Sequence, residues 1–458
     1  MDANLFEKPE IVKIRHEIQK VYLGDSKPWV IGYSGGKDST MVVQLVFEAI
    51  GDLPPQQRTK NIYVISSDTL VENPLIMSFI DDSLRSMANS AHNRKLPITT
   101  HKVSPEYKNS FWINLIGRGY PSPRQHFRWC TDRLKIDPTN KFITNKISEF
   151  GEVIVVLGIR SDESASRAQS IDRHSVEDRL LQRHTTLNNA YIYAPIRDLS
   201  THEVWEYLLA NTSPWGIDHQ RLLDIYQDSS EEPIFMLDKS APATGNSRFG
   251  CWVCTVVTED KALLGLINNN NPELRPLLVL RDWIYEIRDQ EDKREKKRQN
   301  GRIYHVGEGE NQRVGLGPFT LETRKEILRR LLETQKVCGE NEAYISKYGQ
   351  PNLITQEELR LIDQIWLERG NWESSVPIIW EEVMGTPLAW TKPERALFTR
   401  HEINVLEALC DQNDVPLELV HKLLLVEERH TGFTVKRGLF EGLDGVLNQQ
   451  WLHYEEGV

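Results

Sequence analysis

Long hydrophobic runs are missing from this chain of 458 residues. No apolar stretch approaches the roughly 18 residues that a membrane-spanning helix needs, so we expect no membrane association. The opening segment, Met1–Pro9, also lacks the basic start and apolar core of a secretory signal peptide. These absences speak against a membrane protein or an exported one.

Cysteine and positive charge are both in short supply. Five cysteines are a small, odd number, which argues against a disulfide framework and leads us to expect a reducing, cytoplasmic location. The formal net charge is -11, whereas a stand-alone, non-specific nucleic-acid binder normally shows a basic stripe. Any contact with nucleic acid must therefore be local or depend on partner proteins.

The composition that is present, 39% hydrophobic and 26% charged, is typical of a globular protein of two or three domains. Strand-like and helix-like segments alternate in the first half, which predicts an α/β fold with a parallel sheet. Beyond about residue 260 the pattern is mostly helical. We predict an α/β domain over residues 1–235, a cysteine-containing segment with helices over 236–390, and a helical extension over 391–458.

Short apolar runs mark the expected strands after the first, at Ile62–Asp68, Ile98–Val103, Glu152–Gly158 and Tyr191–Ile196. Ligands of parallel sheets bind beyond the carboxyl ends of the strands. Ser34, Asp68, Gly158 and Arg160 fall at such ends, so we expect one shared nucleotide site. We assign Asp68 to the ribose or metal region and Arg160 to a phosphate, with a structural role as the alternative for each.

The most informative segment lies between residues 29 and 40, where an apolar run enters a polar, glycine-containing turn and an apolar helical pattern follows. Gly35 and Gly36 let the backbone approach a polyphosphate, and the first N–H groups of the helix would point at the anion. Lys37 adds a cation, whereas Asp38 would repel a bare phosphate and therefore suggests bound Mg²⁺. The predicted nucleotide-binding residues of this loop are Ser34, Gly35, Gly36, Lys37, Asp38, Ser39 and Thr40.

The loop lacks the Gly-x-x-x-x-Gly-Lys-Ser/Thr spacing of a Walker A motif. It matches Ser-Gly-Gly-x-Asp-Ser, and so it resembles the PP-loop ATP pyrophosphatases. That resemblance implies cleavage of ATP between the α and β phosphates and an adenylated intermediate. An ordinary glycine turn before a buried helix is the alternative reading.

Three cysteines lie in contexts that suit ligands. Cys251 and Cys254 form a C-x-x-C in a loop-like stretch, and this motif alone fits zinc, a redox dithiol or an iron–sulfur cluster. Cys130 lies among Arg128, Arg133 and Lys135, which we expect to lower its thiol pKa and to hold anions. No second C-x-x-C or paired histidine completes a zinc site, whereas cluster thiolates can lie far apart in sequence.

The other two cysteines and one charged segment carry less information. Cys338 and Cys410 lie in helical patterns, and we expect both to be buried structural thiols. Residues 289–302 mix both signs of charge, which favours a solvated helix face, with a local phosphate-contacting patch as the alternative.

Several segments together resemble the DndC family, the PAPS-reductase-like PP-loop component of the bacterial DNA phosphorothioation system. These segments are Pro28–Thr40, Ile65–Pro74, Phe111–Pro121, Phe127–Lys135 and Asn246–Thr255. The resemblance implies a Rossmann-like adenine-nucleotide alpha-hydrolase domain followed by a mostly helical C-terminal region. It also implies ATP, Mg²⁺ and a 4Fe-4S cluster as cofactors.

The same resemblance implies partners and residue roles. The substrate would be DNA, a cysteine desulfurase would supply sulfur, and proteins of the DndD and DndE types would assist. Cys130, Cys251 and Cys254 would hold the cluster. The residues expected to act in catalysis are Lys37, Asp38, Arg133 and Lys135.

One departure from the family pattern bears on the cluster. Some relatives have a cysteine shortly before the Gly-Asn-Ser-Arg-Phe-Gly-Cys motif, but Ala241–Gly245 here contains no thiol. The fourth iron would then lack a cysteine ligand and could hold sulfide, unless Cys338 ligates it. An adenylyl-sulfate reductase, a tRNA thiolase and a non-catalytic nucleotide-binding scaffold remain open alternatives.

Overall fold

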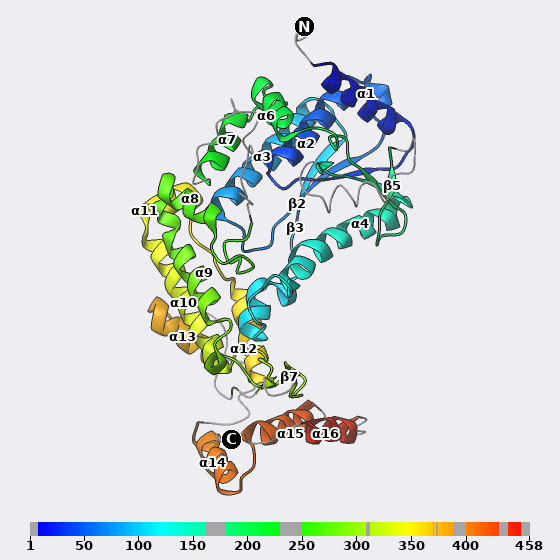
Figure 1. Ribbon diagram of the computed structural model, residues 1–458. Coiled ribbons are helices and arrows are strands. Elements are labelled where there is room, and N and C mark those ends of the chain that lie inside the picture. Colours follow the sequence, from blue (N-terminus) through cyan, green and yellow to red (C-terminus); the bar gives the residue numbers. More distant parts are fainter. Residues whose placement is uncertain are drawn as a thin grey trace. The chain divides into compact units, whose positions relative to one another are not determined.

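The computed structural model describes residues 8–161, 180–229, 250–307, 312–369, 371, 374–388, 400–429 and 438–449 (Figure 1). It divides into two compact units. The first comprises Met1–Glu106, Arg128–Cys254 and Glu259–Leu278, and the second comprises Tyr107–Phe127, Thr255–Thr258 and Val279–Val458. The predicted boundaries at 235/236 and 390/391 fall outside the described residues and stay predictions.

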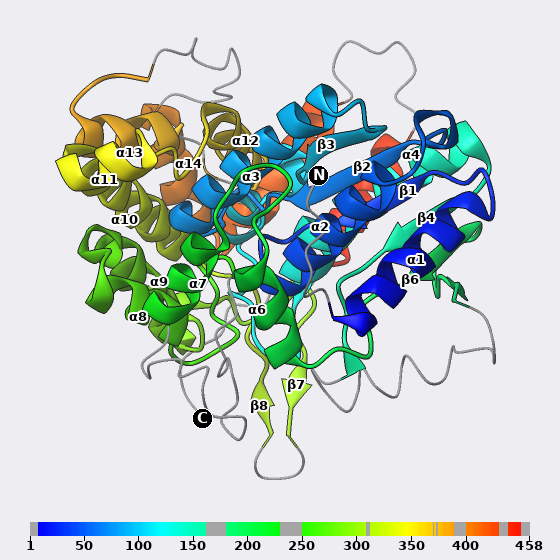
Figure 2. The same ribbon diagram turned by 90° about the horizontal axis from the view of Figure 1, so that it is seen from above.

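The first unit is built on a six-stranded sheet in the order β3-β2-β1-β4-β6-β5, of which Figure 2 shows the first five strands side by side. The strands are β1 (Trp29–Gly32), β2 (Ile62–Ser67), β3 (Ile98–Val103), β4 (Val153–Val156), β5 (Gln182–Arg183) and β6 (Ala190–Tyr193). All neighbouring pairs are parallel except β5 with β6. The predicted parallel-sheet fold is therefore confirmed.

Alternating strand residues pack on opposite faces of the sheet, as the period of two requires. Trp29 and Ile31 of β1 join one buried cluster, whereas Val30 joins another that contains Ile143. The first cluster takes residues from α1 (Pro9–Leu23), α2 (Lys37–Gly51), α3 (Pro74–Asn93), α6 (Thr201–Ala210) and α7 (His219–Asp228). The second is covered by α4 (Asp137–Phe150). Helices on both faces explain why these strands read as continuous apolar runs.

The second unit is mostly helical, as predicted. Its helices are the later part of α9 (Arg275–Ile287), α10 (Leu321–Glu340), α11 (Glu342–Tyr348), α12 (Gln356–Leu367), α13 (Ser375–Met384), α14 (Arg400–Gln412), α15 (Leu417–Arg429) and α16 (Leu439–Leu447). A short hairpin of β7 (His305–Val306) and β8 (Arg313–Val314) interrupts them. No described helix of either unit is long and apolar enough to cross a membrane.

Residues Tyr107–Phe127 belong to the second unit although the chain on both sides belongs to the first. A short π-helix, Ile113–Gly117, packs there against α12. The indole of Trp366 donates to Ile116 O at 2.9 Å, and that of Trp112 donates to Leu353 O at 2.7 Å. This segment therefore serves as core of the second unit.

The predicted helix over residues 289–302 is wrong. Only a short 3-10 turn forms, at Glu291–Lys293, and the chain then runs beside residues 317–319. Glu295 N donates to Pro318 O at 2.7 Å, and the buried Arg294 guanidinium donates to Gly317 O at 2.7 Å. These long-range bonds to backbone carbonyls override the helical propensity of the Glu, Lys, Arg and Gln residues in this segment.

Candidate functional site

We call residues Ser34–Thr40 the phosphate-type loop. It follows β1 and leads directly into α2, as the sequence predicts. Gly35 has a φ of 73°, and a Cβ there would lie only 2.7 Å from Ile80 Cγ1. Glycine alone satisfies both demands. Gly36 has an ordinary φ of -82°, so its backbone conformation does not require glycine. Its lack of a side chain instead leaves room for the hydroxyls of Tyr226 and Ser34, which lie close by.

The hydroxyl groups of the loop bind the loop itself. Ser39 Oγ accepts from Ser34 N at 3.2 Å and donates to Gly36 O at 2.9 Å. Thr40 Oγ1 donates to the same carbonyl at 2.9 Å. The turn is thus held in shape by its own side chains, and the predicted contacts of these hydroxyls with phosphate stay predictions.

Asp38 is paired with two cations. Lys37 Nζ lies 2.9 Å from Asp38 Oδ2, and Arg160 Nε donates to Oδ1 at 2.6 Å. Arg160 is 2% exposed and also donates to Leu199 O at 3.2 Å and to Thr201 Oγ1 at 2.8 Å. One carboxylate between two cations leaves a net positive charge at the first turn of α2, where the helix dipole also favours an anion.

The position of Gly158, just after β4, requires glycine for a steric reason. A Cβ at Gly158 would lie 2.8 Å from the backbone carbonyl carbon of Asp38. Because backbone atoms cannot give way as a flexible side chain can, the close approach of the β4 end to the loop requires glycine. Gly158 and Arg160 therefore both fix the loop from the β4 side, whereas their predicted contacts with a nucleotide are untested.

Asp68, at the end of β2, forms a turn. Its Oδ1 accepts from Leu70 N at 2.8 Å, and its Oδ2 lies 3.3 Å from Lys102 Nζ. Leu70 has a φ of 66°, a left-handed conformation that the Asp68 hydrogen bond supports. This arrangement fits the structural alternative and leaves the predicted ribose or metal role open.

One residue within this turn and one just after it contact Cys251. Its Sγ lies 3.3 Å from Thr69 Oγ1 and donates to Glu72 Oε1 at 3.7 Å. Glu72 Oε1 also accepts from Thr69 Oγ1 at 3.0 Å and lies 3.2 Å from Lys135 Nζ. A backbone bridge joins Glu72 to Cys251. We call Thr69, Glu72, Cys251 and Lys135, together with Cys130 and Cys254, the thiol neighbourhood.

The thiols influence one another electrostatically. Burial and the nearby Cys254 raise the pKa of Cys130 above its ordinary value. Burial and the Glu72 carboxylate raise the pKa of Cys251, and Cys254 adds to this effect. The expected lowering of the Cys130 pKa is therefore wrong, because burial and a neighbouring thiol outweigh the hydrogen bonds from Thr131 and the local backbone.

Lys135 faces this neighbourhood, since Cys251, Glu72 and Cys130 together outweigh the effect of burial and raise its pKa. Arg133 is half-buried on the same short helix, Thr131–Ile136. The sequence analysis missed Glu72 and Thr69, although both lie in a segment that carries the family resemblance. The signal that could have found them is a carboxylate and a hydroxyl directly after a strand end.

The donor set of the thiol neighbourhood suits a thiolate-ligated metal group, because it offers three thiols and a cation that balances negative charge. Among the residues that the structure describes, no three His, Cys, Asp or Glu side chains lie close enough together to hold a metal ion as they stand. Ala241–Gly245 lies outside the described residues. Cys338 and Cys410 are buried, and burial alone raises the pKa of Cys338 to about 12, as befits structural thiols.

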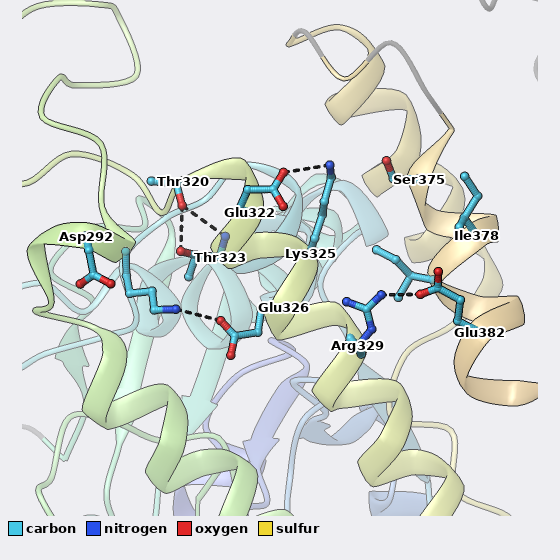
Figure 3. A pocket seen from close by; sticks show the side chains of 12 residues that line it. Asp292, Thr320, Glu322, Thr323, Lys325, Glu326, Arg329, Ser375, Ile378 and Glu382 are labelled. Carbon is cyan, nitrogen blue, oxygen red and sulfur yellow. Dashed lines mark hydrogen bonds and ion pairs between the residues drawn. The ribbon is translucent and has the colours of Figure 1, made fainter. Parts of the chain in front are cut away.

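The second unit contains a surface cavity of about 490 Å³ (Figure 3). Its charged lining is largely paired, with Lys293 Nζ at 3.0 Å from Glu326 and Lys325 Nζ at 3.0 Å from Glu322. Arg329 pairs with Glu382 across the opening. With its charges balanced in this way, the cavity offers no distinct chemistry and none of the predicted site residues lines it.

Comparisons with known proteins agree with the fold. A sequence profile of the phosphoadenosine phosphosulfate reductase domain matches residues 28–257. An uncharacterized protein of Methanocaldococcus jannaschii is 26% identical over 219 residues, which make up 48% of this chain and 38% of that protein. The chain thus spans well under half of the length of that curated relative.

Two solved structures are similar in part. The phosphoadenylyl-sulfate reductase of Candida auris has 14% identity and a TM-score of 0.30, covering 49% of this chain and 94% of that one. The U34-tRNA thiolase NcsA of Methanococcus maripaludis, solved with its 4Fe-4S cluster, has 12% identity and a TM-score of 0.28, covering 61% and 80%. Scores this low carry no argument about activity.

Proposed function

We propose, starting from the fact that the chain belongs to the phosphoadenosine phosphosulfate reductase domain family, that it is an ATP pyrophosphatase that inserts sulfur into the DNA backbone. The finer steps of this proposal concern the substrate and the sulfur chemistry. A cysteine desulfurase would supply the sulfur as a persulfide, a thiol reductant would release it as hydrosulfide, and proteins of the DndD and DndE types would assist at the DNA.

One observation supports the proposal above all. The phosphate-type loop follows the carboxyl end of β1, and the residues that contact Cys251 follow the carboxyl end of β2. These strands are parallel neighbours, with Gly32 beside Ile65, so both groups begin at the same edge of the sheet. A nucleotide site and a group of thiols on one edge are the two parts that an ATP-dependent sulfur transfer needs.

The reaction follows from charge. A phosphodiester anion is a poor electrophile, so one of its non-bridging oxygens first attacks the α-phosphorus of ATP, and pyrophosphate leaves. Hydrosulfide then attacks the DNA phosphorus, a P–S bond forms, and the activated P–O bond breaks with release of AMP and a proton. The attacking sulfur needs no general base, and none is assigned.

The residues of the loop serve the first step. Lys37, the loop amides and the net positive charge around Asp38 would stabilise the charge that develops on pyrophosphate, with Mg²⁺ sharing this role. Arg160 would act by holding Asp38 in place. Arg133 and Lys135 would position the DNA phosphate near the thiol neighbourhood.

The thiols serve the second step. Cys130, Cys251 and Cys254 would hold a 4Fe-4S cluster, whose chemistry when bound is to carry sulfide. Thr69 and Glu72 fix the position of Cys251 through the contacts given above.

The test compares anaerobically purified wild-type protein with Lys37→Ala in pyrophosphate release from ATP. We expect release by the wild type and a loss of at least about hundredfold in the variant, as for removal of a group that stabilises transition-state charge. Lys60→Ala is the matched control, because Lys60 is also a buried lysine paired with an aspartate, at 2.7 Å from Asp25. No release by the wild type, with or without DNA and sulfide, would favour the scaffold alternative.

A further inference from the structure

Tyr226 of α7 reaches the phosphate-type loop from a part of the chain that the sequence analysis left unassigned. Its hydroxyl accepts a hydrogen bond from Lys37 N at 3.4 Å. A Cβ on Gly36 would lie 3.3 Å from the same hydroxyl. The Tyr226 oxygen therefore lies against the first turn of α2.

The Tyr226 hydroxyl contacts a backbone N–H that a bound anion would use. The first N–H groups of a helix have no partner within the helix, and an anion bound at the loop takes them. Lys37 opens α2, so its N–H is one of these groups. In the structure the neutral Tyr226 hydroxyl makes only a long contact with this N–H, beside the place where a phosphate oxygen would accept.

Tyr226 is held firmly. It is 6% exposed, and its ring packs edge-on against Trp205 of α6 with a centroid distance of 5.1 Å. Lys37 Nζ lies 5.8 Å from the centre of its ring. The end of α7 is also fixed by α8 (Lys261–Asn269), since a Cβ on Gly265 would lie 2.8 Å from Asp228 O.

We infer that Tyr226 contacts the nucleotide and that its hydroxyl donates a hydrogen bond to a non-bridging oxygen of the bound triphosphate. A phosphate oxygen that takes the Lys37 N–H must lie within hydrogen-bonding distance of the Tyr226 hydroxyl, because both groups meet at one amide. The charged oxygen is the stronger acceptor, so the hydroxyl changes from acceptor to donor. This inference rests on the proposed binding of ATP at the loop.

The chemistry of the hydroxyl agrees with a donor role. Burial raises the pKa of Tyr226, and the nearby Asp38 carboxylate adds to this effect. The backbone hydrogen bond from Lys37 and the charge of Arg160 lower the pKa by less than burial raises it. The phenol therefore keeps its proton at neutral pH.

The experiment measures binding of a non-hydrolysable ATP analogue, pyrophosphate release and thermal unfolding for the wild type and for Tyr226→Phe. Tyr207→Phe is the matched control, because the Tyr207 hydroxyl donates to Glu48 Oε2 at 2.7 Å and does not contact the loop. Adenosine serves as a control ligand without phosphate.

We expect Tyr226→Phe to weaken binding of the ATP analogue by about tenfold to a hundredfold, as loss of a hydrogen bond to a charged group does. Its binding of adenosine and its Tm should match those of Tyr207→Phe. Unchanged or tighter binding of the analogue by Tyr226→Phe overturns the inference, and tighter binding shows instead that the hydroxyl blocks the loop. A wild type that binds no analogue overturns the nucleotide site itself.

Discussion

The phosphate-type loop and the thiol neighbourhood lie at one edge of the same sheet but are held in different ways. The loop is fixed by buried charges: Lys37, Asp38 and Arg160 pair within 2.9 Å and are all less than 10% exposed. The thiol neighbourhood depends on longer contacts, such as 3.7 Å from Cys251 Sγ to Glu72, and on a half-exposed lysine.

The difference shows which half of the site is already complete. A buried carboxylate between two cations is costly to form and stable only in one geometry, so the loop has its final shape before any ligand arrives. In addition to burial, the nearby Cys254 raises the pKa values of Cys130 and Cys251, and a bound metal group would remove that repulsion. We conclude that the loop is preorganised, whereas the proposed cluster would have to draw the thiols together.

Gly158→Ala should break the loop half most strongly. The added Cβ would lie 2.8 Å from the Asp38 backbone and would displace the first turn of α2. We expect pyrophosphate release to fall by about hundredfold, as for an ångström-scale misplacement of catalytic groups, while iron content stays normal. Gly250→Ala is the control, because a Cβ there meets no atom within 4 Å. Equal activity of the two variants would contradict the described packing.

Cys130→Ser should break the thiol half alone. We expect most of the bound iron and its visible absorption near 400 nm to disappear, roughly as for other thiolate-ligated clusters that lose a ligand. Pyrophosphate release from ATP in the presence of DNA but without sulfide should stay within about twofold, because the sites contribute independently. Cys410→Ser, which alters a buried thiol on α14, serves as the control. Iron retained by Cys130→Ser would remove Cys130 from the ligand set, and iron lost by Cys338→Ser would refute an open fourth site.

Glu72→Gln should have a smaller effect on the thiol half. The amide keeps the shape of the side chain but loses the ion pair with Lys135, which is 45% exposed, so the pair contributes at most about 1 kcal/mol. We expect the iron content to fall less than in Cys130→Ser and ATP binding to stay unchanged. A complete loss of iron would identify Glu72 as a ligand and not as a residue that positions Cys251.

A substitution of His219 tests the packing of α2, the helix that follows the loop, and leaves catalysis unchanged. Its Nε2–H donates at 2.6 Å to the buried Gln44 of α2, and burial lowers the pKa of His219 to about 4. Below about pH 6.5 the imidazole of His219 gains a second proton in the unfolded chain but stays neutral in the folded protein. The contribution of neutral His219 to stability is therefore complete above pH 6.5 and is lost as pH falls towards 4.

We therefore expect His219→Gln to reduce the pH dependence of the unfolding free energy by up to about 1.4 kcal/mol per pH unit between pH 6.5 and 4. Denaturant titrations at several pH values would measure it. The same slope in wild type and variant would show that His219 titrates normally in the folded protein.

Much of the fold could be predicted because it depends on local pattern. Apolar runs located all strands of the six-stranded sheet except β5, and α6 begins at a capping box that Ser200 and Glu203 form three positions apart. The strand expected at Tyr191–Ile196 lies at Ala190–Tyr193, within the usual uncertainty of strand ends. The glycine turn between β1 and α2 likewise follows from neighbouring residues.

The rest depends on residues that are far apart in sequence. The Asp38 pair with Arg160 and the contact of Tyr226 with Lys37 join residues more than a hundred positions apart, and no local pattern encodes such pairings. No local sequence pattern predicts that Tyr107–Phe127 belongs to the second unit while the chain on both sides belongs to the first. The direction of the Cys130 pKa was mispredicted because burial cannot be read from neighbouring charges.

The proposed function requires that ATP cleavage at the loop drives replacement of a DNA oxygen by sulfur at the thiol neighbourhood. The direct test incubates anaerobically purified protein with ATP, Mg²⁺, sulfide and DNA, digests the DNA with nucleases and detects phosphorothioate-linked dinucleotides by mass spectrometry. We predict phosphorothioate linkages that require ATP and vanish in both Lys37→Ala and Cys251→Ser. Pyrophosphate release without sulfur in DNA, together with sulfur in tRNA or sulfite from adenylyl sulfate under matched conditions, would contradict the claim.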